Sequence, residues 1–180
     1  MSATELLTVG VVLERRRSTH PWQDHLWRAT GVLPGMAPSG EWRLLHEADG
    51  VASYLAGTTS LRLFSGETAG YLRNLSQQAP RVYLVLRRAE SDTERPLRPF
   101  LATVCPTEAQ EYLDGDDLVE TVPMPPEIAR WVMDFTRRFH VERVFEKRGR
   151  REREASRAAE TAPRAAETPG VARGERRRDG

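Results

Sequence analysis

The sequence contains a single cysteine, Cys105, and has no lysine before Lys147. One thiol cannot form a disulfide within the chain, and a thiolate metal site needs more than one sulfur, so the composition fits a reducing compartment. Long hydrophobic runs are also missing. The run near the N-terminus, residues 6–13, is interrupted by Thr8 and Gly10 and has arginines after it rather than before it. It is too short to span a membrane and lacks the order of a signal peptide, so we expect a cytoplasmic protein without membrane contact.

Charge is distributed unevenly over the 180 residues. Residues 1–146 carry 16 arginines against 20 acidic residues, whereas residues 147–180 carry 11 basic residues against 6 acidic ones. The second segment has no aromatic residue and Val171 as its one large aliphatic, too little apolar surface to offset chain entropy. We predict one β-rich globular domain over residues 1–146 and a disordered basic tail over residues 147–180.

A period of two dominates the predicted domain. Leu7, Val9, Val11 and Leu13 alternate with more polar residues, as in a strand with one buried face. Asp49-Gly50 separates residues 42–47 from residues 51–56 and predicts a tight hairpin, and Gly57 predicts a further turn. Residues 81–87 and 100–104 alternate in the same way.

Helical patterns are fewer. Thr107 and Gln110 have the spacing of a capping box, which predicts a short helix that Gly115 closes. After Pro125-Pro126, apolar residues recur every three or four positions up to Phe139 and predict an amphipathic helix. Residues 67–78 fit either a helix or a strand, and the neighbouring strands favour a strand. The fold class is therefore α+β: a mostly antiparallel sheet or a partly closed barrel with a C-terminal amphipathic helix and a disordered tail.

Residues 21–28 (PWQDHLWR) form the most distinctive segment. Aromatic residues and arginine dominate binding hot spots, so a partner-binding surface is predicted from Trp22, Asp24, His25, Trp27 and Arg28. The plainer interpretation is that one tryptophan belongs to the core and that Asp24 pairs with Arg28 on the sheet surface.

Motifs for other chemistry are weak. His20 and His25 with Asp24 between them could bind a metal, but no third ligand lies nearby, and we expect ordinary surface histidines. Cys105 lies in a predicted strand without a helix directly after it, so a buried thiol is expected. No phosphate-binding loop or nucleophile elbow is present, and neither a cofactor nor a metal is expected.

The tail carries a basic run made of Lys147, Arg148, Arg150 and Arg151. It predicts an auxiliary electrostatic contact with an acidic surface. Glutamates interrupt the run and no aromatic residue is available for base stacking, so nucleic-acid binding is disfavoured.

Several segments resemble an uncharacterised bacterial family catalogued as "domain of unknown function 3305". They are VGVVLERR (9–16), PWQDHLWR (21–28), GVLP (31–34), VYLVLR (82–87), EAQEYL (108–113), VPMP (122–125) and FEKR (145–148). The resemblance covers residues 8–148. It implies a link to molybdenum-dependent formate dehydrogenases, whose genes lie beside those of family members.

Some members are labelled as molybdenum cofactor guanylyltransferases (molybdopterin-guanine dinucleotide biosynthesis protein A), and that label does not suit this chain. Such enzymes open with a glycine-rich loop followed by an arginine and a lysine, whereas Gly10 is followed by more strand and no lysine precedes Lys147. Alternating strands also disfavour a parallel α/β sheet.

The sequence thus favours a non-catalytic accessory protein over an enzyme. Its partner would be a protein, with formate dehydrogenase or its maturation factors implied by the resemblance. The alternative function is binding of a small anionic ligand, such as the molybdopterin cofactor or formate, through Arg28 and Arg43, because the planar guanidinium donates two hydrogen bonds to an anion.

Overall fold

The computed structural model describes residues 3–22, 24–89, 92 and 94–141, and its described residues belong to one compact unit, Met1–Val141. The predicted tail, its basic run at Lys147, Arg148, Arg150 and Arg151, and the predicted domain boundary lie outside the described residues. The elements follow in the order β1 (Thr4–Arg17), β2 (His25–Pro34), β3 (Trp42–Ala48), β4 (Val51–Phe64), the 3-10 helix η1 (Ser65–Glu67), α1 (Thr68–Leu75), β5 (Arg81–Arg88), β6 (Leu97–Thr103), α2 (Pro106–Gln110), β7 (Leu118–Pro123) and α3 (Pro126–Phe139).

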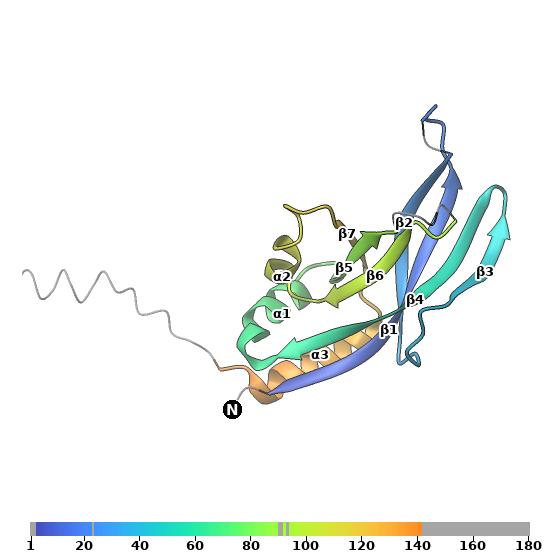
Figure 1. The fold of residues 1–180 in the computed structure, drawn as a ribbon. Coiled ribbons are helices and arrows are strands. Elements are labelled where there is room, and N and C mark those ends of the chain that lie inside the picture. Colours follow the sequence, from blue (N-terminus) through green and yellow to red (C-terminus); the bar gives the residue numbers. More distant parts are fainter. Residues whose placement is uncertain (1–2, 23, 90–91, 93, 142–180) are drawn as a thin grey trace, which may run out of the picture. The chain divides into compact units, whose positions relative to one another are not determined.

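The strands form one mixed sheet in the order β2-β1-β4-β6-β5-β7, and β3 pairs with β4 beside this path. Of these pairings, β4 with β6 is parallel and the others are antiparallel. The sheet curls until β2 comes close to β7, which makes a nearly closed barrel (Figure 1). The predicted α+β class, the partly closed barrel and the C-terminal helix are confirmed.

The barrel core follows the two predicted periodicities. On β1, Val9, Val11 and Leu13 are fully buried, as the alternation predicts. On α3, the apolar stripe buries Ile128, Val132 and Phe135 completely. Full burial of each such side chain contributes about 1.5–3 kcal/mol, so the packing of α3 on the sheet is a major source of stability.

A β-bulge replaces the turn predicted at Gly57, and that prediction is wrong. Gly10 faces Thr58 and Val12 faces Leu55, so the single residue Val11 faces both Ala56 and Gly57. Gly57 has φ +94, a conformation that favours glycine. The strand β4 therefore continues through the bulge as one element.

A helix also replaces the strand favoured at residues 67–78. In α1, Asn74 is fully buried, and its side-chain amide donates to the carbonyls of Arg81 (2.7 Å) and Val104 (2.8 Å) and accepts from the Arg81 N–H (2.9 Å). The Tyr71 hydroxyl accepts from the Phe64 N–H at 2.9 Å. These contacts tie the helix to three strands or their ends and outweigh the local preference for a strand.

The short helix predicted from Thr107 is present as α2, but its cap is different. Cys105 is the N-cap residue and no side chain caps the helix, so the predicted capping box between Thr107 and Gln110 is not formed. The helix ends at Gln110, before Gly115.

Two hairpins extend from the barrel and are called the arm here, made of residues 13–29 and 42–56 (Figure 1). Along β4 the neighbouring strand changes: residues 51–56 pair with β3, whereas Leu61 pairs with β6. The sheet therefore forks at the middle of β4, between β3 and β6.

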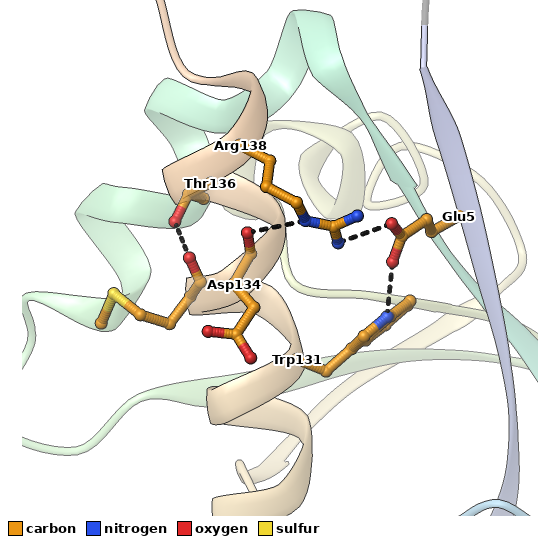
Figure 2. Close-up of polar contacts among 6 residues, drawn as sticks. Glu5, Trp131, Asp134, Thr136 and Arg138 are labelled. Carbon is orange, nitrogen blue, oxygen red and sulfur yellow. Dashed lines mark hydrogen bonds and ion pairs between the residues drawn. The ribbon is translucent and has the colours of Figure 1, made fainter.

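Glu5 joins the start of β1 to α3 (Figure 2). Its Oε2 accepts from the Trp131 indole at 2.8 Å, and its Oε1 pairs with the Arg138 guanidinium at 2.6 Å. The Glu5 side chain is 29% exposed and that of Arg138 is 52% exposed, so water screens the ion pair in part.

We predict that Glu5→Ala lowers the free energy of unfolding by about 1–2 kcal/mol, because a half-buried indole N–H loses its acceptor and the ion pair is lost. Arg137→Ala is the matched control: its ion pair with Asp134 joins side chains that are 72% and 66% exposed, so its loss should be within about 0.5 kcal/mol of no effect. Urea unfolding measures both. Equal midpoints for the two variants would contradict a structural role of Glu5.

We predict that Gly57→Ala destabilises the domain by about 1–3 kcal/mol, because alanine is strained at φ +94 and its Cβ would lie 3.1 Å from the Ser39 carbonyl oxygen. Gly66→Ala serves as control, since open space surrounds that position. Thermal unfolding compares the two, and an unchanged melting temperature for Gly57→Ala would count against the bulge.

Candidate functional site

One face of the arm gathers aromatic residues from three strands. Trp27 faces Arg15 across the β1–β2 pair, and Tyr54 faces Leu13 across the β1–β4 pair. Because directly paired residues project from the same face, these side chains lie together. Leu13 is fully buried, so this face continues the core of the barrel outward.

The aromatic cluster consists of Trp27, Trp42 and Tyr54, each half-buried. The Trp27 and Trp42 rings meet edge to face at 5.4 Å, and Tyr54 lies 5.6 Å from Trp27 and 5.7 Å from Trp42, between ring centroids. Such pairs contribute about 0.5–1.5 kcal/mol beyond burial, so the cluster is a rigid platform with one side open to solvent.

Arg15 lies over the edge of this platform. Its guanidinium carbon is 5.5 Å from the Tyr54 ring centroid, and its Nη2 is 3.4 Å from Glu47 Oε1. The ring and the ion pair both orient Arg15, and the Glu47 carboxylate is its described charge partner.

Two cavities flank Trp42. The first, about 400 Å³, lies in the fork of the sheet; its lining residues are Gly40, Trp42, Ala56, Gly57, Thr58, Asp92, Arg95, Arg98 and Pro99. The second, about 380 Å³, lies on the aromatic face and is lined by Arg15, Trp42, Leu44, Tyr54, Glu94 and Arg95. Both cavities have Trp42 and Arg95 in their lining, so they are neighbours, and together they are called the arm groove below.

The arm groove has a positive end. Arg95 and Arg98 are exposed, and within the ranges that the structure describes neither has an ion-pair partner. Asp92 lies beside them, but its Oδ1 already accepts from the N–H groups of Glu94 (3.1 Å) and Arg95 (2.8 Å). Among the described lining residues, the fork therefore has two guanidinium groups against one carboxylate, an excess of positive charge.

The five residues predicted as a partner surface are spread over the β1–β2 hairpin. Trp22 is 93% exposed at its tip, and Asp24, also exposed, closes the loop by accepting from the Ser18 N–H at 3.0 Å through its backbone carbonyl. On β2, His25 and Trp27 alternate with Arg28, which projects from the opposite face. Among the described ion pairs none joins Asp24 to Arg28, and of the two tryptophans in residues 21–28 it is Trp27 that packs against the core.

Arg28 and Arg43, considered for an anionic ligand, are not brought together. They lie on β2 and β3, the outer strands of the arm, with β1 and β4 between them. Three strand spacings put these two strands roughly 14 Å apart, and Arg28 is in register with His46 rather than with Arg43.

Cys105 is 1% exposed, as expected for a buried thiol. Contrary to expectation, a helix does follow it, because Cys105 is the N-cap of α2. Burial nevertheless raises the pKa of the thiol, and Glu67, whose Oε2 is 3.5 Å from Sγ, adds to this rise. The backbone N–H groups of Glu108 and Thr107 act in the opposite direction but are weaker.

Within the described part of the chain, no group of three or more His, Cys, Asp or Glu side chains is arranged to hold a metal ion. His20 and His25 are both exposed. Nor does any described helix combine the length and apolar character that crossing a membrane requires.

Three residues of the arm groove that the sequence interpretation missed are Trp42, Tyr54 and Arg95. With a simple two-residue hairpin turn, Tyr54 would face Leu45 and Trp42 would lie on the other face. A bulge at Leu45 makes Tyr54 face Leu44 instead and brings both rings to one face. The sequence signal for this cluster was that Trp42 and Tyr54 lie on the two strands joined by the Asp49-Gly50 turn.

Comparison with known proteins identifies a family. A family model with the description "Protein of unknown function (DUF3305)" matches residues 8–149. No curated protein matches the chain, and no solved structure does.

We predict that the raised pKa of Cys105 makes the domain less stable in alkali. Below the ordinary thiol pKa of 9.0 the full stability is present. Above it the unfolded thiol ionises while the folded one stays protonated, so stability falls until the pH reaches the raised folded pKa. The pKa of buried Tyr71 is also raised by burial and acts in the same direction above 10.0.

The measurement is the urea midpoint at pH 8 and pH 10 for the wild type and Cys105→Ala. The variant should lose less stability between the two pH values, because it lacks the buried thiol. Equal losses in both proteins would show that Cys105 is not protected by burial.

Proposed function

The chain belongs to the DUF3305 family of proteins of unknown function, and from the surface of its arm we propose that it is a non-catalytic accessory protein that binds another protein. The single observation that carries the proposal is Trp22, a tryptophan 93% exposed at the tip of the β1–β2 hairpin. An indole in water contributes nothing to the core, whereas tryptophan is among the residues that contribute most at protein interfaces.

The surroundings of Trp22 support the same function. Leu26, Leu44 and Leu45 are large apolar residues of the arm that are also exposed. Leu44 pairs with Tyr54 and extends the face of the aromatic cluster beside Arg15, whereas Leu26 and Arg28 project from the opposite face of β2. An apolar centre with aromatic residues and arginine is the usual composition of a protein-binding patch.

The partner that we propose is a molybdenum-dependent formate dehydrogenase or one of its maturation factors, in the cytoplasm. This part of the proposal comes from the family resemblance rather than from the geometry. The basic run Lys147, Arg148, Arg150 and Arg151 is proposed as an auxiliary electrostatic contact, which should weaken as salt is raised.

A small-molecule function is the alternative, and its support now lies in the arm groove rather than at Arg28 and Arg43. Arg95 and Arg98 line a cavity of about 400 Å³, within the range of about 300–1,000 Å³ that ligand sites occupy.

We predict that the double variant Trp22→Ala, Arg28→Ala reduces partner capture at least about tenfold, because loss of a hot-spot aromatic alone costs about 2 kcal/mol or more. The full-length tagged chain is used as bait in its native host grown with formate, and the recovered formate dehydrogenase subunits are quantified.

The matched control is Leu113→Ala, Arg73→Ala, which removes an exposed apolar residue and an exposed arginine outside the arm. It should capture as the wild type does. Equal capture by a folded Trp22→Ala, Arg28→Ala variant would remove the hairpin tip from the interface. Failure of the wild type to recover the enzyme or its maturation factors would disprove the proposed partner.

A further inference from the structure

We infer that the arm groove binds an extended, acidic, proline-containing segment of the partner protein. This inference rests on the proposed function and specifies the chemistry of the segment. Its proline packs against Trp42 and Tyr54, and its carboxylates pair with Arg95 and Arg98.

The shape of the arm groove favours a chain segment over a compact ligand. The two cavities share Trp42 and Arg95 in their lining, and each of them, at about 400 and 380 Å³, has room for a few side chains at most. An occupant that fills both must extend from one cavity to the other past Trp42. A peptide in extended conformation has that form.

The apolar end of the groove suits proline. Trp42 and Tyr54 stand with their ring centroids 5.7 Å apart and are held by Trp27 behind them. Grooves lined by aromatic side chains bind proline-rich segments, because such segments are already extended and lose little entropy on binding. The cluster is built before the ligand arrives, so ordering it costs nothing at binding.

The other end of the groove determines the sign of the ligand. Arg95 and Arg98 have no described ion-pair partner, whereas Arg15 is already paired with Glu47. The described acidic residues of the groove are Asp92 in the fork, whose Oδ1 accepts from two N–H groups of its own loop, and Glu94 in the cavity that holds the aromatic rings. Carboxylates of the ligand should lie near Arg95 and Arg98, because there two guanidinium groups outnumber the one carboxylate of Asp92.

Addition of the ligand as a further strand on β3 is disfavoured. The bulge at Leu45 interrupts the regular spacing of the free edge, and Arg43 and Glu47 place charges along it. The segment should lie across the face of the arm instead, where side chains rather than backbone groups recognise it.

The test is isothermal titration calorimetry of the full-length chain with the peptide acetyl-Pro-Leu-Pro-Asp-Glu-Asp-amide, at low and at moderate salt. The comparison peptide carries Asn, Gln and Asn in place of the acids. Inorganic phosphate is titrated alone as a simple anion. The acidic peptide should bind, its affinity should fall with salt, and the neutral peptide should bind at least about tenfold more weakly, as expected for two charge-assisted contacts.

The double variant Arg95→Ala, Arg98→Ala should weaken binding of the acidic peptide at least about tenfold. Arg43→Ala, Arg62→Ala removes the same charge from exposed positions outside the groove and should bind as the wild type does. Trp42→Phe should reduce the affinity for both peptides alike, because it shrinks the apolar platform without changing charge.

Four outcomes would overturn the inference: no binding of the acidic peptide, equal binding of the two peptides, equal binding by the Arg95→Ala, Arg98→Ala variant, or phosphate binding as tight as that of the peptide. The last result would identify a simple anion site. Self-association of the wild type that is abolished by Arg95→Ala, Arg98→Ala would assign the groove to a second copy and overturn it as well.

The two proposals can fail separately. If the peptide binds but no formate dehydrogenase component is captured, the groove chemistry stands and the proposed partner is wrong. If the Arg95→Ala, Arg98→Ala variant captures the partner as well as the wild type does, the accessory function stands. The arm groove is then not the surface that binds the partner.

Discussion

Successive residues of a strand project from opposite faces of the sheet. In this fold that constraint acts most strongly on β4, because β4 belongs to both the barrel and the arm. Its second half supplies Leu61 and Leu63 to the barrel, and its first half supplies Tyr54 to the arm. These residues differ in parity, so an uninterrupted strand could not place all three on one face. The bulge at Ala56 and Gly57 makes the change of parity, and the arm groove lies next to it.

Two more bulges complete the aromatic face. On β2 the pairing shifts at Thr30, so Trp27 rather than Arg28 faces Arg15. On β3 the shift at Leu45 brings Trp42 and Tyr54 together. Each bulge inserts one residue, so every side chain beyond it on that strand projects from the opposite face of the sheet. The platform for binding is thus a product of three irregularities in otherwise regular strands.

This explains which features the sequence could predict. Alternation identified β1, the Asp49-Gly50 hairpin was correct, and the apolar stripe from Ile128 to Phe139 was correct as α3, because each depends on neighbours close in sequence. The arm groove depends on bulges, each of which shifts the alternation by one residue, and these shifts were not recognised in the sequence. Residues 21–28 were identified by their composition, and composition does not tell which face of the sheet each side chain projects from.

The helix α1 was mistaken for a different reason. Its identity depends on Asn74, whose amide reaches Arg81 at the start of β5 and Val104 just beyond β6. In the sequence these partners are 7 and 30 positions away. A short amphipathic segment has no strong local preference, so distant hydrogen bonds decide its conformation.

The barrel and the arm also differ in the chemistry of their side chains. The barrel holds the described residues with raised pKa values, Tyr71 and Cys105, as neutral groups in the core. The arm carries the exposed indole, and the fork beside it carries Arg95 and Arg98, which have no described ion-pair partners. Stability and recognition are thus assigned to different parts of one sheet, and changes on the arm can alter binding while the barrel keeps its core.

The contact of Glu5 with α3 also constrains the order of events when the protein is made. Trp131 and Arg138 lie 126 and 133 positions after Glu5, so the ribosome delivers the first partner long before the others. Until α3 emerges, the nascent β1 has no cover for the face that carries Val9, and the core stays open to water. Pairings so distant in sequence form slowly and leave apolar surface exposed meanwhile. During synthesis, the growing chain therefore depends on α3 to protect β1.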